Sequence, residues 1–112
     1  MRKEFSFESQ DGKQIFVYKW EAKKPVAAVQ IAHGAVEHAL RYDDFANALA
    51  KQGFVVYAND HRGHGKTAGE ADNVGYFSDQ KGGINLAIDD MLALTKIIKK
   101  ENPYMPVFLF GH

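Results

Sequence analysis

The chain has 112 residues, 46% of them hydrophobic and 12% aromatic, which is typical of a folded globular domain and not of a disordered segment. Its 14 basic and 14 acidic side chains balance, so no basic surplus indicates nucleic acid or an anionic membrane as a partner. The absence of cysteine excludes a disulfide framework and thiolate chemistry.

The first residues of the chain favour a cytoplasmic location. Arg2 and Lys3 are followed by polar residues at 8–11, where a signal peptide would have an apolar stretch. No run of the sequence reaches the roughly 18 apolar residues that a transmembrane helix needs. We therefore expect a soluble, cytoplasmic protein without a transmembrane segment.

The first two predicted elements are strands at Phe5–Ser9 and Gln14–Trp20. The turn between them contains Asp11 and Gly12, and Asp-Gly is a strong signal for a β-hairpin. Apolar side chains alternate along the second strand, which predicts a half-exposed antiparallel pair.

Three nearly continuous apolar runs follow, at Val26–Ala32, Phe54–Ala58 and Val107–Phe110. Runs without alternation are typical of strands that are covered on both faces, as in parallel sheets. We therefore expect three parallel strands.

Amphipathic patterns between these runs predict two helices. The first spans Asp43–Gln52, with Gly53 as its C-terminal cap, and the second spans Ile84–Lys100, before Asn102-Pro103. The tryptophan and the apolar stripe of the second helix are expected to be core, and not a lipid-facing surface: Trp20, Met91, Leu94 and Ile98.

This order of elements predicts an α/β fold, with a doubly wound, mostly parallel sheet and an antiparallel N-terminal hairpin. The strand at 107–110 is expected to lie inside a larger sheet, because it would otherwise leave an open edge. Single α/β domains often run to about 200–250 residues. We therefore expect residues 1–112 to be the N-terminal portion of one domain, and to be inactive by themselves.

Glycine-rich and polar segments follow the predicted parallel strands, where the ligands of open α/β sheets gather. The informative residues are His33-Gly34-Ala35, Glu37-His38, Arg41-Tyr42, Asp60, Arg62-Gly63, Gly65, Gly75-Tyr76 and Gly111-His112. With these residues the chain resembles, over nearly its whole length, the N-terminal portion of an α/β-hydrolase. The resemblance is greatest to the monoacylglycerol lipase and lysophospholipase group.

The last two residues match the nucleophile elbow of this superfamily, G-x-S-x-G, in which a serine follows a buried strand. Gly111 and His112 occupy the first two positions, so the resemblance implies that the serine follows His112. It also implies a carboxylic-ester hydrolase whose Ser-His-Asp triad lies beyond residue 112. Such an enzyme acts on a small acyl-ester or lipid-like substrate, without a metal or organic cofactor.

His33, Gly34 and Ala35 are expected to form the oxyanion loop. Attack on an ester carbonyl places negative charge on oxygen, and preorganised N–H donors stabilise that charge. Gly34 lets the backbone turn tightly without a side chain in the way. The resemblance implies that the Ala35 N–H is one donor and that the residue after the serine supplies the other. The alternative is a plain turn between strand and helix.

Glu37 and Arg41 are four residues apart and would face each other on one helical turn. The resemblance implies that they lie near the entrance and hold a polar head such as glycerol. The alternative is an exposed ion pair, worth about 0–1 kcal/mol. Asp60 and Arg62 are expected to secure neighbouring loops, and neither is expected to be catalytic.

Two further motifs are rejected. The histidines at 33, 38, 61 and 64 do not form an H-E-x-x-H pattern, so no metal is expected. The G-K-T sequence at 65–67 matches the end of a P-loop, but Asp60 stands where the first glycine belongs and would repel phosphate.

Fold alone does not define the reaction. Another acyl-transfer enzyme of this fold (a peptidase, thioesterase or haloperoxidase) is therefore one alternative. A non-catalytic α/β-hydrolase-like binding protein is another, and the residue after His112 distinguishes it from an enzyme.

Overall fold

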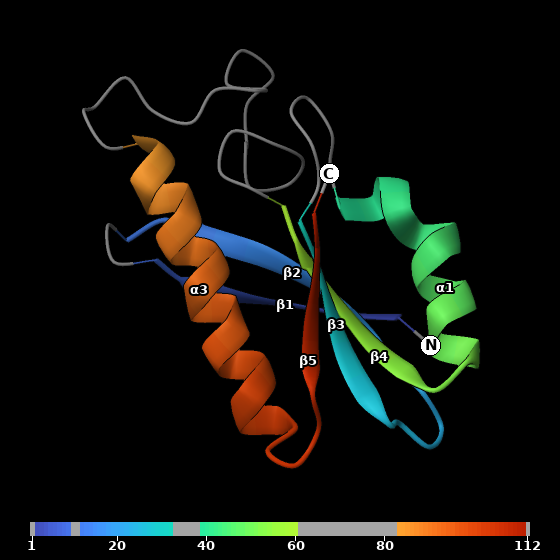
Figure 1. Ribbon diagram of the computed structural model, residues 1–112. Helices are drawn as coiled ribbons and strands as arrows, with labels where there is room; N and C mark the ends of the chain where they lie inside the picture. The colour runs from blue at the N-terminus through green and yellow to red at the C-terminus, as the bar shows by residue number, and fades with distance from the viewer. Residues whose placement is uncertain (1, 10–11, 33–38, 61–82, 112) are drawn as a thin grey trace.

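The computed structural model describes residues 2–9, 12–32, 39–60 and 83–111, with the backbone alone for 83–87. Within them a five-stranded sheet separates two α-helices (Figure 1). The strands are β1 (Arg2–Glu8), β2 (Gln14–Trp20), β3 (Ala27–Ala32), β4 (Phe54–Asn59) and β5 (Val107–Gly111). The helices are the 3₁₀-helix η1 (Ala39–Tyr42), α1 (Asp43–Lys51) and α3 (Gly83–Glu101).

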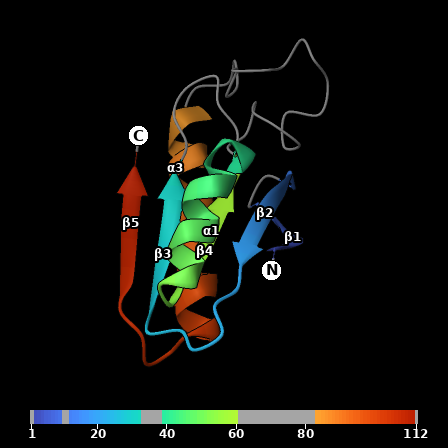
Figure 2. The same cartoon turned by 90° about the vertical axis from the view of Figure 1, so that its right-hand side faces the viewer.

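The sheet has the strand order β1-β2-β4-β3-β5. β3 pairs in parallel with both β4 and β5, whereas β2 pairs antiparallel with both β1 and β4. α1 covers one face of the sheet and α3 covers the other (Figures 1 and 2). This arrangement confirms the predicted doubly wound, mostly parallel sheet with an antiparallel N-terminal hairpin.

Each face of the sheet has its own hydrophobic core, because successive side chains of a strand point to opposite faces. Beneath α1 the core contains Tyr18, Trp20, Val29, Ile31, Ala39, Ala46, Val56 and Ala58. Beneath α3 it contains Val17, Ala28, Val55, Tyr57, Leu94 and Ile98. The prediction that Trp20, Leu94 and Ile98 are core residues is confirmed, while Met91 is half-buried.

The prediction of a half-exposed hairpin is right for β1 and wrong for β2. Ile15 and Val17 are fully buried, and Tyr18 is 2% exposed. β2 lies between β1 and β4, and its side chains enter the cores beneath both α1 and α3. The alternating pattern therefore does not indicate a solvent-facing side in this strand.

The predicted helices agree with the observed ones within two residues. Gly53 follows α1 with φ +96, and its N–H donates to the Ala50 carbonyl over 3.1 Å, as predicted for a glycine that caps the C-terminal end of the helix. β1, in contrast, begins three residues before its predicted start. Its register pairs Arg2 with Trp20, a long-range partner that no local pattern reveals.

Among the described residues, β5 pairs with β3 on one side only and forms an edge of the sheet. Its apolar residues Phe108, Leu109 and Phe110 are 55%, 64% and 42% exposed. Neither α1 nor α3, as far as the structure describes the chain, has the length and apolar character needed to cross a membrane.

Candidate active site

The carboxyl ends of three parallel strands meet at one edge of the sheet, which is where open α/β sheets bind ligands. Ala32 ends β3, Asn59 ends β4 and Gly111 ends β5. The ladder between β3 and β5 pairs Ala32 with Gly111, and neighbouring strands lie about 4.8 Å apart. The predicted elbow glycine therefore lies beside the residue that precedes the predicted oxyanion loop.

Most of the predicted site residues lie outside the described residues: His33, Gly34, Ala35, Glu37 and His112. Their roles in the oxyanion loop, the substrate entrance and the elbow therefore stay predictions. The same holds for Arg62, for the G-K-T sequence and for all five histidines, so the expectation that no metal binds also stays a prediction.

Arg41 is described, and it is exposed on η1. The ring of the next residue, Tyr42, meets the ring of Phe110 edge-on, with 6.5 Å between their centroids. The rings of Phe45 and Phe110 lie 5.2 Å apart. Because Phe110 directly precedes Gly111, the turn that carries Arg41 lies next to the end of β5.

Asp60 directly follows β4 and is 1% exposed. Its Oδ1 accepts a hydrogen bond from the Ala39 N–H over 2.7 Å, and its own N–H donates to the Phe16 carbonyl over 2.9 Å. The Tyr18 hydroxyl lies 3.5 Å from Oδ2 and donates to it. These contacts join β2 and β4 to the start of η1. They agree with the expected role of Asp60 in securing a neighbouring loop, which stays a prediction.

Tyr18 belongs to this cluster, although the sequence pattern places it only on a strand. Burial, followed by the charge of the neighbouring Asp60, raises the pKa of Tyr18 to about 12, so its hydroxyl stays a donor. A buried tyrosine usually needs a polar partner, and Asp60 after a buried strand is a suitable one. To predict the contact of Tyr18 with Asp60, one must know that β2 pairs with β4, a pairing that sets Val17 opposite Asn59.

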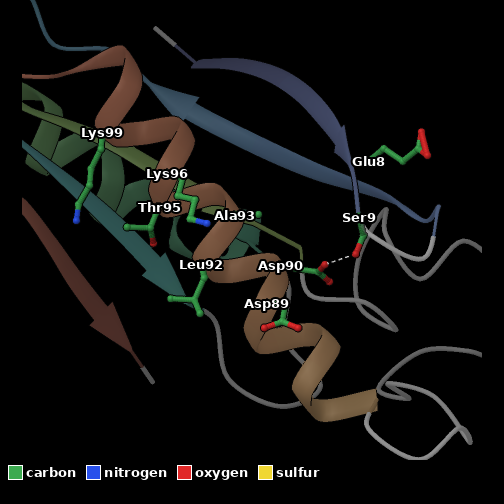
Figure 3. Close-up of a pocket in the computed structure, with 9 residues that line it drawn as sticks. All are labelled: Glu8, Ser9, Asp89, Asp90, Leu92, Ala93, Thr95, Lys96 and Lys99. Atoms are coloured by element: carbon green, nitrogen blue, oxygen red, sulfur yellow. Dashed lines mark hydrogen bonds between the residues drawn. The ribbon is translucent and has the colours of Figure 1, made fainter.

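A hollow of about 530 Å³ lies elsewhere, between the end of β1 and α3 (Figure 3). In it the buried Ser9 hydroxyl donates to Asp90 Oδ1 over 2.5 Å, and Lys96 and Lys99 extend from α3. The serine of a Ser-His-Asp triad needs a histidine as its base, and no histidine occurs among the described residues that line this hollow. We therefore place the candidate active site at the carboxyl ends of β3, β4 and β5.

Comparison with known proteins shows the class of the fold: the chain is an α/β-hydrolase. Residues 23–112 match the family described as "Serine aminopeptidase, S33", and the chain belongs to that family.

The chain is similar to curated and solved relatives that are much longer than it is. It is 36% identical to monoglyceride lipase from Rattus norvegicus over 103 residues, which cover 91% of the chain and 32% of the relative. It is 33% identical to monoacylglycerol lipase from Mycolicibacterium smegmatis over 112 residues, which cover 99% and 38%. A solved carboxyl esterase from Bacillus coagulans, in complex with glycerol, superposes with a TM-score of 0.86 at 37% identity, covering 99% and 36%. The chain therefore spans about a third of the length of these relatives.

Proposed function

We propose that the intact protein is a serine ester hydrolase of the lipase and esterase type, and that residues 1–112 form the N-terminal portion of its α/β-hydrolase domain. The pairing of Gly111 with Ala32 carries this proposal, because it sets the predicted elbow beside the start of the predicted oxyanion loop. The names of the relatives, monoglyceride lipase and carboxyl esterase, support ester hydrolysis as the reaction class.

In the proposed mechanism, the hydroxyl oxygen of the serine after His112 attacks the acyl carbonyl carbon. A histidine beyond residue 112 takes the hydroxyl proton and gives it to the leaving alcohol oxygen, and a carboxylate orients that histidine. Water then attacks the acyl-enzyme and releases the fatty acid. The part of this chain is to place the Ala35 N–H against the oxyanion, where one such donor is worth about 10²–10³ in rate.

The proposed substrate is a monoacylglycerol, with its glycerol end held by Glu37 and Arg41. The contact between Tyr42 and Phe110 supports this, because it keeps the turn of Arg41 beside the end of β5. The relatives named monoglyceride lipase support the same substrate class. Lysophospholipids have a comparable ester on glycerol and are a second substrate to assay. The cytoplasmic location expected from the sequence also stays a prediction, which fractionation of cells would test.

A peptidase is the second candidate, favoured by the description of the matching family as a serine aminopeptidase. The two candidates differ in the bond that is cleaved. The intact protein should therefore be assayed in parallel with a monoacylglycerol and with an aminoacyl amide. Faster release of fatty acid supports the lipase, whereas faster cleavage of the amide supports the peptidase.

The serine mechanism has its own test in the intact protein. A fluorophosphonate should label the residue directly after His112, and labelling should abolish hydrolysis. A folded protein that hydrolyses the ester but is not labelled there would contradict the mechanism. A folded protein that cleaves neither substrate and is not labelled would support a non-catalytic binding protein.

A further inference from the structure

Asp60 connects β4 to β2 and to η1, and both contacts of its carboxylate are buried. Its backbone N–H bonds to Phe16 on β2, its Oδ1 accepts from the Ala39 N–H, and its Oδ2 faces the Tyr18 hydroxyl. Ala39 is fully buried and Tyr18 is nearly so. Because β2 and β4 are inner strands of the sheet, the carboxylate is fixed on a rigid support.

Ala39 is where this support meets the predicted catalytic segment. It is the first residue of η1, and it directly follows residues 33–38. The N–H groups of a first helical turn have no partner within the helix, so a buried one needs an acceptor from elsewhere. Asp60 supplies that acceptor at 2.7 Å, the short distance expected for a bond to a carboxylate.

The two residues that flank 33–38 are therefore held by different contacts. Before the segment, Ala32 lies in the ladder opposite Gly111 of β5. After it, Ala39 is held by Asp60. The first contact ties Ala32 to the strand of the predicted elbow, and the second fixes Ala39 to the inner strands.

We infer that Asp60 is a positioning residue for catalysis, which acts through Ala39 to hold the predicted oxyanion loop in register with the elbow strand. This inference rests on the proposed ester hydrolase function and adds a determinant of turnover to it. A displacement of about 1 Å at a catalytic group costs up to about 10²-fold in rate. Loss of the Asp60 acceptor should therefore lower kcat and leave KM nearly unchanged.

Two variants of Asp60, made in the intact protein, test the inference. Asp60→Ala removes the acceptor and should lower kcat by roughly 10–10²-fold. Asp60→Asn keeps an oxygen that accepts from Ala39, but a neutral acceptor bonds less strongly than a carboxylate. It should lower kcat by only a few fold and thus partly restore what the alanine variant loses.

Asp90 is the matched control. It lies on α3, it is 2% exposed, and its carboxylate accepts a hydrogen bond from the Ser9 hydroxyl. Asp90→Ala and Asp90→Asn remove or weaken a buried acceptor of the same kind, so they should lower the melting temperature while leaving kcat unchanged. Comparison of the two series separates positioning from a general loss of stability.

Amide hydrogen exchange at Ala39 gives a readout that does not depend on activity. Exchange should be faster in Asp60→Ala than in the wild type, intermediate in Asp60→Asn and unchanged in the Asp90 variants. If Asp60→Ala does not fold, the comparison of Asp60→Asn with Asp90→Asn still tests the inference. Only Asp60→Asn should then lower kcat and speed the exchange of the Ala39 amide.

Three results would overturn the inference: an unchanged kcat in the Asp60 variants, an equal loss of kcat in the Asp90 variants, or unchanged exchange at Ala39. A wild-type protein that hydrolyses no ester would refute the proposed function and the catalytic role of Asp60 together. If the Asp60→Ala variant of such a protein still showed faster exchange at Ala39 than its wild type, Asp60 would have a structural role only.

Discussion

Asp60 and Asp90 are almost equally buried, yet they hold different parts of the molecule. Burial of a carboxylate is costly unless hydrogen bonds compensate, and each of the two has a donor at 2.7 Å or less. Asp60 bonds to the backbone of Ala39 at the carboxyl edge of the sheet, whereas Asp90 bonds to the side chain of Ser9. At the scale of single residues, the partner of a buried group decides which part of the molecule that group holds.

The oxyanion role of Ala35 is tested by removing its N–H. Ala35→Pro in the intact protein should lower kcat by about 10²–10³-fold, because one of two donors to the oxyanion is lost. Initial rates of monoacylglycerol hydrolysis measure this. Circular dichroism and thermal unfolding should show a folded variant. Near-normal turnover would remove Ala35 from the oxyanion hole.

At the scale of elements, a polar cluster fastens the C-terminal end of α3 to the sheet. Glu101, the last residue of α3, accepts from the Tyr57 hydroxyl over 2.5 Å and from Lys19 Nζ over 3.1 Å. Asn102 donates to the Tyr57 oxygen over 3.1 Å. The cluster joins α3 to β4 through Tyr57 and to β2 through Lys19.

The pKa values of this cluster follow from its geometry. Burial by itself raises the pKa of Glu101, but hydrogen bonds from Tyr57 and Lys19 and the charge of Lys19 outweigh it, so the pKa lies below the ordinary 4.5. A carboxyl whose pKa is lower in the folded state stabilises the fold above its unfolded pKa. That contribution is lost as the pH falls through the folded value.

Glu101→Gln should therefore lower the free energy of unfolding by about 1 kcal/mol at pH 7, because the ion pair is lost and the Tyr57 hydroxyl keeps only a neutral acceptor. The difference in the free energy of unfolding between this variant and the wild type should stay constant above about pH 5. It should become smaller as the pH falls below 4.5. Urea unfolding at several pH values measures it.

Glu21→Gln is the control, since Glu21 pairs with Lys3 over 3.3 Å at the surface. Glu21→Gln should change the free energy of unfolding by no more than about 0.5 kcal/mol. An equal loss in both variants, or a difference at Glu101 that does not shrink as the pH falls below 4.5, would contradict the role of the cluster.

At the scale of the whole molecule, the described part of the fold has one well-covered region and one open side. The side chains of β2, β3 and β4 enter cores on both faces of the sheet. β5, in contrast, exposes Phe108, Leu109 and Phe110 at an edge that has no further strand among the described residues. An exposed apolar edge strand is a site of association.

A polypeptide of residues 1–112, produced by itself, should therefore self-associate at micromolar concentration. Leu109→Lys should reduce association, because a lysine on an edge strand opposes pairing with another strand. Val26→Lys is the control, since Val26 is 63% exposed but lies outside β5. Sedimentation velocity measures the self-association of the wild-type polypeptide and of the two variants. A monomeric wild-type polypeptide, or an equal effect of both lysines, would contradict the assignment to β5.

Local sequence patterns were sufficient for the type and order of the elements. Apolar runs marked β3, β4 and β5, and helical periodicity with Gly53 marked α1 within one residue. The polar and glycine positions after the strands were sufficient for the resemblance to α/β-hydrolases, which the comparisons confirm as the fold and family. These features depend on neighbouring residues or on short motifs, so they can be read along the chain.

Tertiary structure alone decided which residues lie together. The burial of β2 on both faces depends on its pairing with β4, and the extra length of β1 depends on its pairing with β2. The bond from Ala39 to Asp60 joins residues 21 positions apart, and the contact of Tyr18 with Asp60 joins residues 42 apart. Periodicity gives the direction in which a side chain points but not the partner that it meets, because the partner is set by strand order and register.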